Sequence, residues 1–283
     1  TIGKEGKGDR QMGFKLIAGN RPQLWLGSFD IFPQDKFRHG ISTKHGGCSQ
    51  GQYASLNLGL HVEDEAEKVI ANRRIFCEAL GIDSEKTTTC QQVHGNNVAV
   101  ITEKQAGAGF LDFSQSIPDT DALITNVPEV PLMLFFADCT PILLADPAHR
   151  AVGLAHGGWK GTFGSIVAKT VEAMQDNYGS RPEDILAAIG PSIGSCCYQI
   201  GDDLAAKFRA RFPEFQAEIL SGPEGNVHLD LQKTNTLQLL QAGLKPEHIE
   251  NAHVCTCCHS EQFFSYRADK GKTGRIAAII SVK

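Results

Sequence analysis

Three side chains that bind transition metals lie in short polar turns beside apolar segments. His94 precedes one such segment, Cys139 lies between two, and His156 ends one and is followed by two glycines. Strand ends hold side chains rigidly, and glycine lets a ligand approach the backbone closely. Imidazole and thiolate are donors that zinc prefers. Because no pair of the three has the short spacing of a local zinc motif, three unrelated structural residues remain an alternative.

The chemistry of such a set follows from its number of donors. Two nitrogens and one sulfur leave a fourth coordination position open, as in catalytic rather than structural zinc sites, and water in that position becomes acidic near neutral pH. Asp138 precedes Cys139, and we predict that it orients a ligating histidine. The alternative for Asp138 is a solvated turn residue.

The spacing of apolar residues predicts the helices and strands that must position these three side chains. Strands outnumber the helices that could cross between them, so the sequence predicts an α+β fold, with mixed sheets flanked by helices. No Pro/Ser-rich linker interrupts the chain, so we predict a flexible tail over 1–21 and a single domain over 22–283. We expect helices over 63–80, 162–179, from about 202, and over 231–242, and strands over 98–101, 132–137, 142–145, 151–155 and 276–282.

Composition narrows the class of protein. With 283 residues and 41% hydrophobic content, the chain is large enough to form a core without disulfides. Its net charge of -5 with no basic run argues against nucleic acid as a partner, and no apolar run reaches the ~18 residues of a membrane helix. Nine cysteines, an odd number, and no secretory signal favour free thiols in the cytoplasm. We interpret Cys255, Cys257, Cys258 and His259 as groups near the core rather than as a second metal site.

Several longer motifs occur together over most of the chain, from about Ile41 to the C-terminus. In this order they closely resemble the YfiH-like family, known as laccase-domain or polyphenol-oxidase proteins and now regarded as purine nucleoside phosphorylases. The motifs are Ser42-Thr43-Lys44-His45-Gly46-Gly47, Ser55-Leu56-Asn57-Leu58-Gly59, Asn72-Arg73, Gln91-Gln92-Val93-His94-Gly95, Asp121-Ala122-Leu123, Asp138-Cys139-Thr140-Pro141, His156-Gly157-Gly158-Trp159-Lys160-Gly161-Thr162, Ile189-Gly190-Pro191-Ser192-Ile193-Gly194, Phe263-Phe264-Ser265-Tyr266-Arg267 and Thr273-Gly274-Arg275.

The resemblance implies a YfiH-like layered fold and a catalytic zinc on His94, Cys139 and His156. It implies phosphorolysis of adenosine, inosine, guanosine and methylthioadenosine, together with adenosine deamination, so the partners are a purine nucleoside and phosphate. By motif and charge, the substrate-binding candidates are Lys44, Asn57, Arg73, Lys160 and Arg267, and we expect Lys44 to bind phosphate. The family often has arginine in place of Lys44 and Lys160, and lysine cannot hold an oxyanion in a bidentate manner.

Two other functions remain open. Cys139 with a histidine as base would suit an amidase or cysteine hydrolase, and some bacterial relatives are linked to peptidoglycan precursors. A copper-dependent polyphenol oxidase (laccase) is the third hypothesis, because a set of two histidines and a cysteine also binds copper tightly. A blue-copper site adds an axial methionine, and this chain has only three methionines and no H-x-H pair for a copper cluster.

Overall fold

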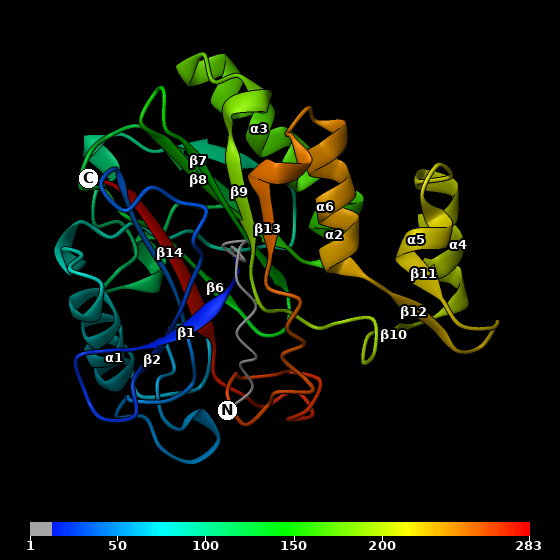
Figure 1. Cartoon of the computed structure of the whole chain (residues 1–283). Coiled ribbons are helices and arrows are strands. Elements are labelled where there is room, and N and C mark those ends of the chain that lie inside the picture. Colours follow the sequence, from blue (N-terminus) through cyan, green and yellow to red (C-terminus); the bar gives the residue numbers. More distant parts are fainter. Residues whose placement is uncertain (1–12) are drawn as a thin grey trace, which may run out of the picture.

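Residues 13–283 are described by a computed structural model (Figure 1). The strands are β1 (Lys15–Ala18), β2 (Trp25–Ser28), β3 (Phe37–Ser42), β4 (Val98–Val100), β5 (Ala122–Thr125), β6 (Leu132–Phe136), β7 (Thr140–Asp146), β8 (Ala151–Gly157), β9 (Leu186–Ile189), β10 (Gln199–Ile200), β11 (Leu220–Ser221), β12 (Val227–Leu229), β13 (Ile249–Asn251) and β14 (Ile276–Val282). The helices of more than one turn are α1 (Ala66–Ala79), α2 (Trp159–Phe163), α3 (Ile166–Tyr178), α4 (Asp202–Arg211), α5 (Gln216–Ile219) and α6 (Leu231–Gln241).

Two sheets form the body of the molecule. One has the strand order β1-β2-β3-β14-β6 and the other the order β13-β9-β7-β8-β5-β4. The β4–β5 and β13–β9 pairs are parallel, whereas β7 pairs antiparallel with both β8 and β9. Parallel and antiparallel pairs therefore occur in one sheet, which confirms the predicted α+β class with mixed sheets.

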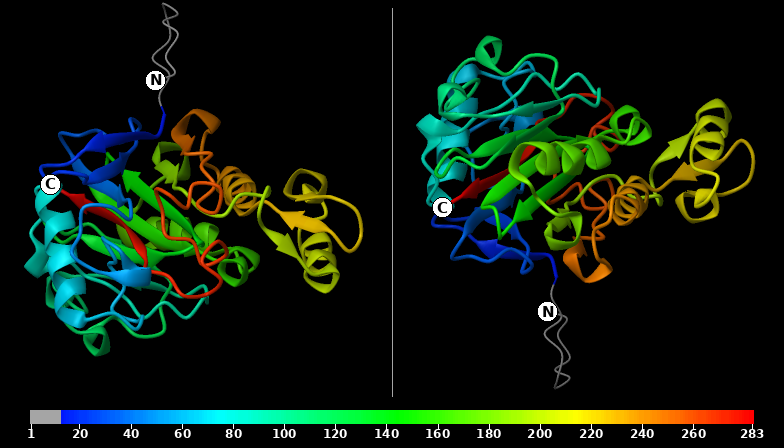
Figure 2. Two further views of the ribbon diagram at one scale, coloured as in Figure 1. Left: turned by 90° about the horizontal axis from the view of Figure 1, so that it is seen from below. Right: turned by 90° about the horizontal axis from the view of Figure 1, so that it is seen from above.

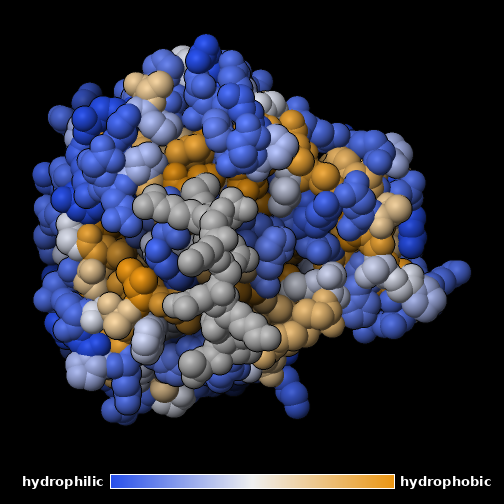
Figure 3. Space-filling model, in the orientation of Figure 1, coloured by the Kyte–Doolittle hydropathy of each residue, from blue (hydrophilic) through white to orange (hydrophobic). Residues whose placement is uncertain are grey.

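Alternating side chains along the strands generate the layers. Leu134 and Leu143 point into the core between the two sheets, while their neighbours Met133 and Leu144 face outward onto helices. The outer face of the first sheet packs on α1, and the outer face of the second packs on α3 and α6. The solvent side of α3 is hydrophilic (Figure 3), as expected of a helix that buries only one face.

A small lobe projects from this body, as both views in Figure 2 show. It contains the three-stranded sheet β10-β12-β11 and the helices α4 and α5. The lobe has its own hydrophobic cluster, in which Phe208, Phe212 and Phe215 pack together. The chain enters the lobe after β9 and returns from β12 into α6, so the loop after β9 is a point of attachment.

The predicted N-terminal tail over 1–21 needs correction where the structure describes it. Lys15–Ala18 forms β1, which pairs antiparallel with β2, and the ring of Phe14 packs against Phe29 at 5.1 Å between centroids. Leu16 and Ile17 stay exposed, so backbone hydrogen bonds rather than a buried apolar face define this strand. Such a strand has no period-two pattern that would predict it from sequence. Residues 1–12 lie outside the described part.

The helices and strands near the motifs agree closely with prediction. The helix expected over 63–80 is α1, and the one expected over 162–179 is α3, which the short α2 precedes. Gly179 ends α3 with a φ of 71°, a conformation that glycine adopts without strain. No helix within 13–283 has both the length and the hydropathy needed to cross a membrane.

The buried His39 in β3 gives the fold a dependence on pH. The backbone N–H of Phe29 donates to His39 Nε2 at 2.9 Å, so that nitrogen must be unprotonated. Burial lowers the pKa of His39 to about 4. In the unfolded chain its pKa is about 6.5. Between about pH 6.5 and pH 4, His39 is therefore protonated in the unfolded state but not in the folded state.

We therefore predict that stability falls between about pH 6.5 and pH 4, with His39 contributing roughly 3 kcal/mol of this loss. Urea unfolding at a series of pH values measures it. His39→Gln keeps an acceptor oxygen but does not titrate, so its stability should decline less steeply. An identical pH slope in the two proteins would contradict the prediction.

Candidate metal centre and its pocket

The fold brings His94, Cys139 and His156 together. One donor atom from each lies within 4.8 Å of the other two. Cys139 immediately precedes β7 and His156 lies near the end of β8, and these strands pair so that Pro141 is opposite His156. His94 comes from the loop before β4. The rings of His94 and His156 meet edge to face, with 4.9 Å between centroids.

The side chain that organises these groups is Asp121, just before β5. Its carboxylate accepts the Nδ1–H of His156 at 2.8 Å and three successive backbone N–H groups, from Val93 at 3.3 Å, His94 at 3.0 Å and Gly95 at 2.6 Å. With Nδ1 occupied in this way, Nε2 of His156 faces Cys139 and His94. Burial raises the pKa of Asp121, but the bond and charge of His156 and the backbone donors outweigh this and keep the pKa below its usual value.

The backbone around the cluster is shaped to let the ligands approach. His94 has a φ of 60°, a left-handed conformation that is unfavourable for a residue with a Cβ and is held here by its bond to Asp121. A Cβ added to Gly158 would lie 3.1 Å from Cys139 Sγ and 3.2 Å from His94 Cδ2. Glycine at this position therefore leaves open the space between the donors.

The electrostatics of the cluster suit a soft cation. Burial raises the pKa of Cys139, but the charge of His156 and hydrogen bonds from His156 and His94 lower it to about 6 overall. Burial lowers the pKa of His156, and the thiolate of Cys139 together with Asp121 raises it to about 9. Thiolate is thus favoured at neutral pH, and a metal ion would take the place of the imidazolium proton. Two nitrogens and one sulfur fit a zinc ion with one open position.

The cluster borders a cavity of about 550 Å³, a size suited to a small molecule. Aromatic side chains form much of the wall, and two guanidinium groups add positive charge. The lining residues outside the cluster include Phe113, Phe135, Trp159, Tyr198, Tyr266, His61, Asp138, Arg267 and Arg275.

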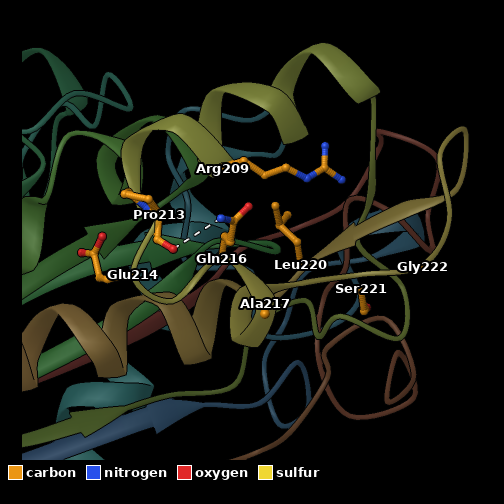
Figure 4. A pocket seen from close by; sticks show the side chains of 8 residues that line it. All are labelled: Arg209, Pro213, Glu214, Gln216, Ala217, Leu220, Ser221 and Gly222. Atoms are coloured by element: carbon orange, nitrogen blue, oxygen red, sulfur yellow. Dashed lines mark hydrogen bonds between the residues drawn. The ribbon is translucent and has the colours of Figure 1, made fainter.

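A different depression lies on the lobe, between α4, α5 and β11 (Figure 4). Its volume is about 370 Å³, and Arg209, Glu214 and Gln216 are among its lining residues. None of the predicted site residues borders it, and it has no histidine or cysteine to bind a metal. The cavity beside the three-residue cluster is therefore the better candidate for an active site.

The predicted substrate residues fall into two groups. Arg267 lines the cavity, donating to the carbonyl oxygens of Cys197 at 2.6 Å and Gln199 at 3.4 Å. Lys44 and Lys160 do not line it: the ammonium of Lys44 bonds to the carbonyl of Ser260, and Lys160 is exposed on α2. The motifs predicted that both positions carry a positive charge. They could not predict which way each side chain points, because neighbouring loops decide this.

Asn57 and Arg73 also need correction, because both are buried behind the cavity wall. Arg73 donates to the carbonyl oxygens of Leu58, Gly109 and Phe110, so its charge holds loops together instead of meeting a ligand. Asn57 Oδ1 accepts the backbone N–H of Arg275 at 2.9 Å. Asn57 thus positions a cavity residue from behind.

The predicted role of Asp138 differs as well. Its carboxylate accepts the hydroxyl of Thr256 at 2.6 Å and the backbone N–H of Arg267 at 2.8 Å, so it fastens the Arg267 loop. Asp121 orients the histidine instead. Sequence reasoning noted Asp121 only as part of a motif and gave it no role, because 35 residues separate it from His156.

Two further cavity residues were missed. Arg275 appeared only in a motif, although its Nη1 donates to the carbonyls of Thr273 and Gly274 while the side chain borders the cavity. His61 also borders the cavity, where desolvation, followed by the charges of Arg275 and Arg73, lowers the pKa of its imidazole.

Known proteins are similar to this chain in sequence and in fold. The family model described as multi-copper polyphenol oxidoreductase laccase matches residues 38–283. Purine nucleoside phosphorylase YlmD of Geobacillus stearothermophilus is 43% identical over 242 residues, which cover 85% of this chain and 88% of that protein. The crystal structure of YlmD from the same organism superposes with a TM-score of 0.89 at 39% identity, covering 95% of this chain and 98% of that one.

The crystal structure of the Bacillus licheniformis hypothetical protein YfiH also has a TM-score of 0.89, at 35% identity, and covers 95% of this chain and 99% of that one. These matches confirm the resemblance found in the motifs. The chain belongs to the multi-copper polyphenol oxidoreductase laccase family, the YfiH-like family of its structural neighbours.

Proposed function

We propose that this protein is a cytoplasmic, zinc-dependent purine nucleoside phosphorylase acting on adenosine, inosine, guanosine and methylthioadenosine. The observation that carries the proposal is the convergence of His94, Cys139 and His156 on an aromatic cavity that also contains guanidinium groups. The names of the similar curated proteins support the same reaction. A zinc ion held by these three residues would supply Lewis-acid chemistry, which also suits adenosine deamination as a second activity.

The cavity offers groups for each part of a phosphorolysis. A phosphate oxygen attacks C1′ of the ribose, the bond from C1′ to the purine nitrogen breaks, and its electron pair leaves with the base. Phosphate needs cations, and Arg275 and Arg267 both border the cavity. The rings of Phe113, Phe135 and Trp159 offer flat apolar surfaces for a purine.

Arg275 is the better candidate for phosphate. Within residues 13–283, only Nη1 of its guanidinium donates a hydrogen bond, so Nη2 and Nε remain for a ligand. Both terminal nitrogens of Arg267 already donate to backbone carbonyls. Asn57 holds the Arg275 backbone from the buried side, which limits the freedom of the side chain.

A cysteine hydrolase is the second candidate, supported by one specific arrangement. Asp121, His156 and Cys139 form a chain from carboxylate to imidazole to thiol, and the pKa of Cys139 is lowered to about 6 despite burial. Without metal, this order matches an orienting acid, a base and a nucleophile. Because a metal-ligated thiolate is a poor nucleophile, amide hydrolysis would appear only in metal-free protein, whereas phosphorolysis should disappear there.

Copper oxidase activity is the third candidate, in keeping with the family description. The described residues hold two groups of three or more possible metal ligands, and only the His94 group borders the large cavity. A single site of this kind lacks the neighbouring copper cluster of a multicopper enzyme. We therefore expect phenol oxidation to be weak and dependent on added copper.

The metal ligands give the first prediction. His94→Ala, Cys139→Ala and His156→Ala should each lose one equivalent of zinc per chain, because two remaining donors hold zinc poorly. Elemental analysis of the purified variants measures this. His61→Gln is the matched control, since His61 lines the same cavity outside the donor cluster and should keep its zinc. Unchanged zinc in all three ligand variants would remove the assignment.

The second prediction concerns Asp121. In Asp121→Asn the amide nitrogen cannot accept an N–H group and the charge is lost, so zinc affinity should fall about 10–100-fold. Competition with a chromophoric chelator measures the affinity. Asp138→Asn is the control, because its carboxylate contacts Thr256 and Arg267 rather than a ligand. Equal losses in the two variants would show that Asp121 has no special role.

The third prediction concerns phosphate. Arg275→Ala should raise the phosphate concentration needed for half-maximal release of ribose 1-phosphate from inosine by about 10–100-fold, the value of a charge-assisted hydrogen bond. Lys44→Ala should leave it unchanged, because that ammonium is held at Ser260 outside the cavity. The reverse pattern would restore Lys44 as the phosphate ligand. A parent protein with no phosphate dependence would exclude phosphorolysis and favour the hydrolase.

A further inference from the structure

A second group of possible metal ligands lies outside the candidate active site. One sulfur from each of Cys196, Cys197, Cys255 and Cys258 lies within 4.8 Å of the other three. The Sγ of Cys258 is 3.4 Å from that of Cys196 and 3.4 Å from that of Cys197. A tetrahedral zinc site with Zn–S bonds of about 2.3 Å places its sulfurs about 3.8 Å apart. The four thiols are thus already near the spacing of a zinc site.

Two loops bring these cysteines together. One follows β9 and the other follows β13, and because β9 and β13 are parallel neighbours, both loops leave the same edge of the sheet. A bridge then joins the loops, with Ser192 N–H donating to the Val254 carbonyl at 3.2 Å and Thr256 N–H donating back to Ser192 at 3.0 Å. The loops are therefore fixed to each other before any metal is bound.

The backbone geometry supports four ligands on one ion. Adjacent cysteines can share an ion only where the chain turns, and a turn is present at Gly194, whose carbonyl accepts N–H groups from Cys197 and Tyr198 at 3.0 Å each. Cys255 and Cys258 have the two-residue spacing of a zinc-binding pair. The Sγ of Cys255 also accepts backbone N–H groups from Gly194 at 3.2 Å and Cys258 at 3.5 Å, which favours its thiolate.

Ordinary packing of thiols does not explain the group. Cysteine side chains often gather in protein cores, because cysteine behaves as a small apolar residue. Here Cys196 and Cys258 are exposed, Cys197 is half-buried, and only Cys255 is buried. Our interpretation of Cys255 to His259 as groups near the core holds for Cys255, which is buried in the lobe cluster, and for Cys257, which packs against it, but not for the exposed Cys258. It missed Cys196 and Cys197, which lie some 60 residues earlier in the chain.

We propose that Cys196, Cys197, Cys255 and Cys258 bind a structural zinc ion. Four thiolates fill a tetrahedral site and leave no open position, so the ion has no catalytic role. Binding is a ligand exchange without oxidation or reduction: each thiol bonds through its sulfur and releases its proton to solvent. The ion would fasten the loop that enters the lobe to the loop after β13.

This position links the site to the candidate active site. Tyr198 follows the first cysteine pair and Arg267 follows the second, and both line the cavity. The guanidinium of Arg267 donates to the carbonyl of Cys197 and lies 5.5 Å from the ring of Tyr198. A zinc ion here would therefore hold one wall of the cavity at a fixed distance from the body, whatever reaction the cavity performs.

Elemental analysis of the full chain, purified under reducing conditions, tests the proposal without any activity assay. We expect two zinc ions per chain in the parent protein and one in Cys196→Ser, Cys255→Ser and Cys258→Ser. Cys257→Ser is the matched control: it changes a cysteine of the same loop outside the group of four and should keep both ions. Cys139→Ala should also keep one zinc, and the double variant Cys139→Ala/Cys255→Ser should keep none, so losses at the two sites are told apart because they add.

A second measurement does not depend on folded serine variants. In the parent protein, zinc should protect the four thiols from iodoacetamide while the exposed Cys48 reacts, and a mercurial reagent should release the ion into a chromophoric chelator. Cobalt in Cys139→Ala should still give the thiolate charge-transfer band, since only the second site then has sulfur ligands. Two outcomes would overturn the proposal. One is a single zinc per chain with the four thiols as reactive as Cys48, and the other is a disulfide among the four cysteines in protein purified under reducing conditions.

Discussion

The carboxylate of Asp121 is the contact on which the candidate site depends. It accepts three backbone N–H groups of the His94 loop and the Nδ1–H of His156, and so joins two candidate ligands that come from different elements. A single anion thereby fixes a left-handed backbone at His94, the tautomer of His156 and the side from which both rings approach Cys139. Because these bonds are charge-assisted and at least partly buried, the two candidate ligands are held in place without an ion.

Buried polar side chains hold the loops of the cavity wall, and Arg73 and Asn57 do so without lining the cavity themselves. Arg73 joins loops through three carbonyls, Asn57 holds the backbone of Arg275, and Asp138 holds that of Arg267. Unpaired burial of such groups would be costly, so each one requires its partners to stay in place. Polar motif residues can therefore shape the cavity through the backbone that they hold.

The apolar framework could be predicted from the sequence to a large extent. Strands such as β6, β7, β8 and β14 are continuous apolar runs, because both faces are buried, between the sheets on one side and under helices on the other. Helices such as α3 show apolar spacing and end at a glycine. By contrast, β1 leaves Leu16 and Ile17 exposed and is defined by its partner β2, so no local pattern reports it.

The sequence by itself determined the fold class, the family and the three residues of the candidate metal site, because these depend on residue type, periodicity and local motifs. Only the tertiary structure decided what the charged and polar motif residues do. The ammonium of Lys44 bonds to a carbonyl, Arg73 and Asn57 lie behind the cavity wall, Arg275 lines the cavity, and Asp121 rather than Asp138 bonds to His156. The tertiary structure also places the sulfur of Cys196 beside that of Cys258. The direction of a side chain, and the contact between loops far apart in sequence, are fixed by strand pairing and packing, which no local pattern contains.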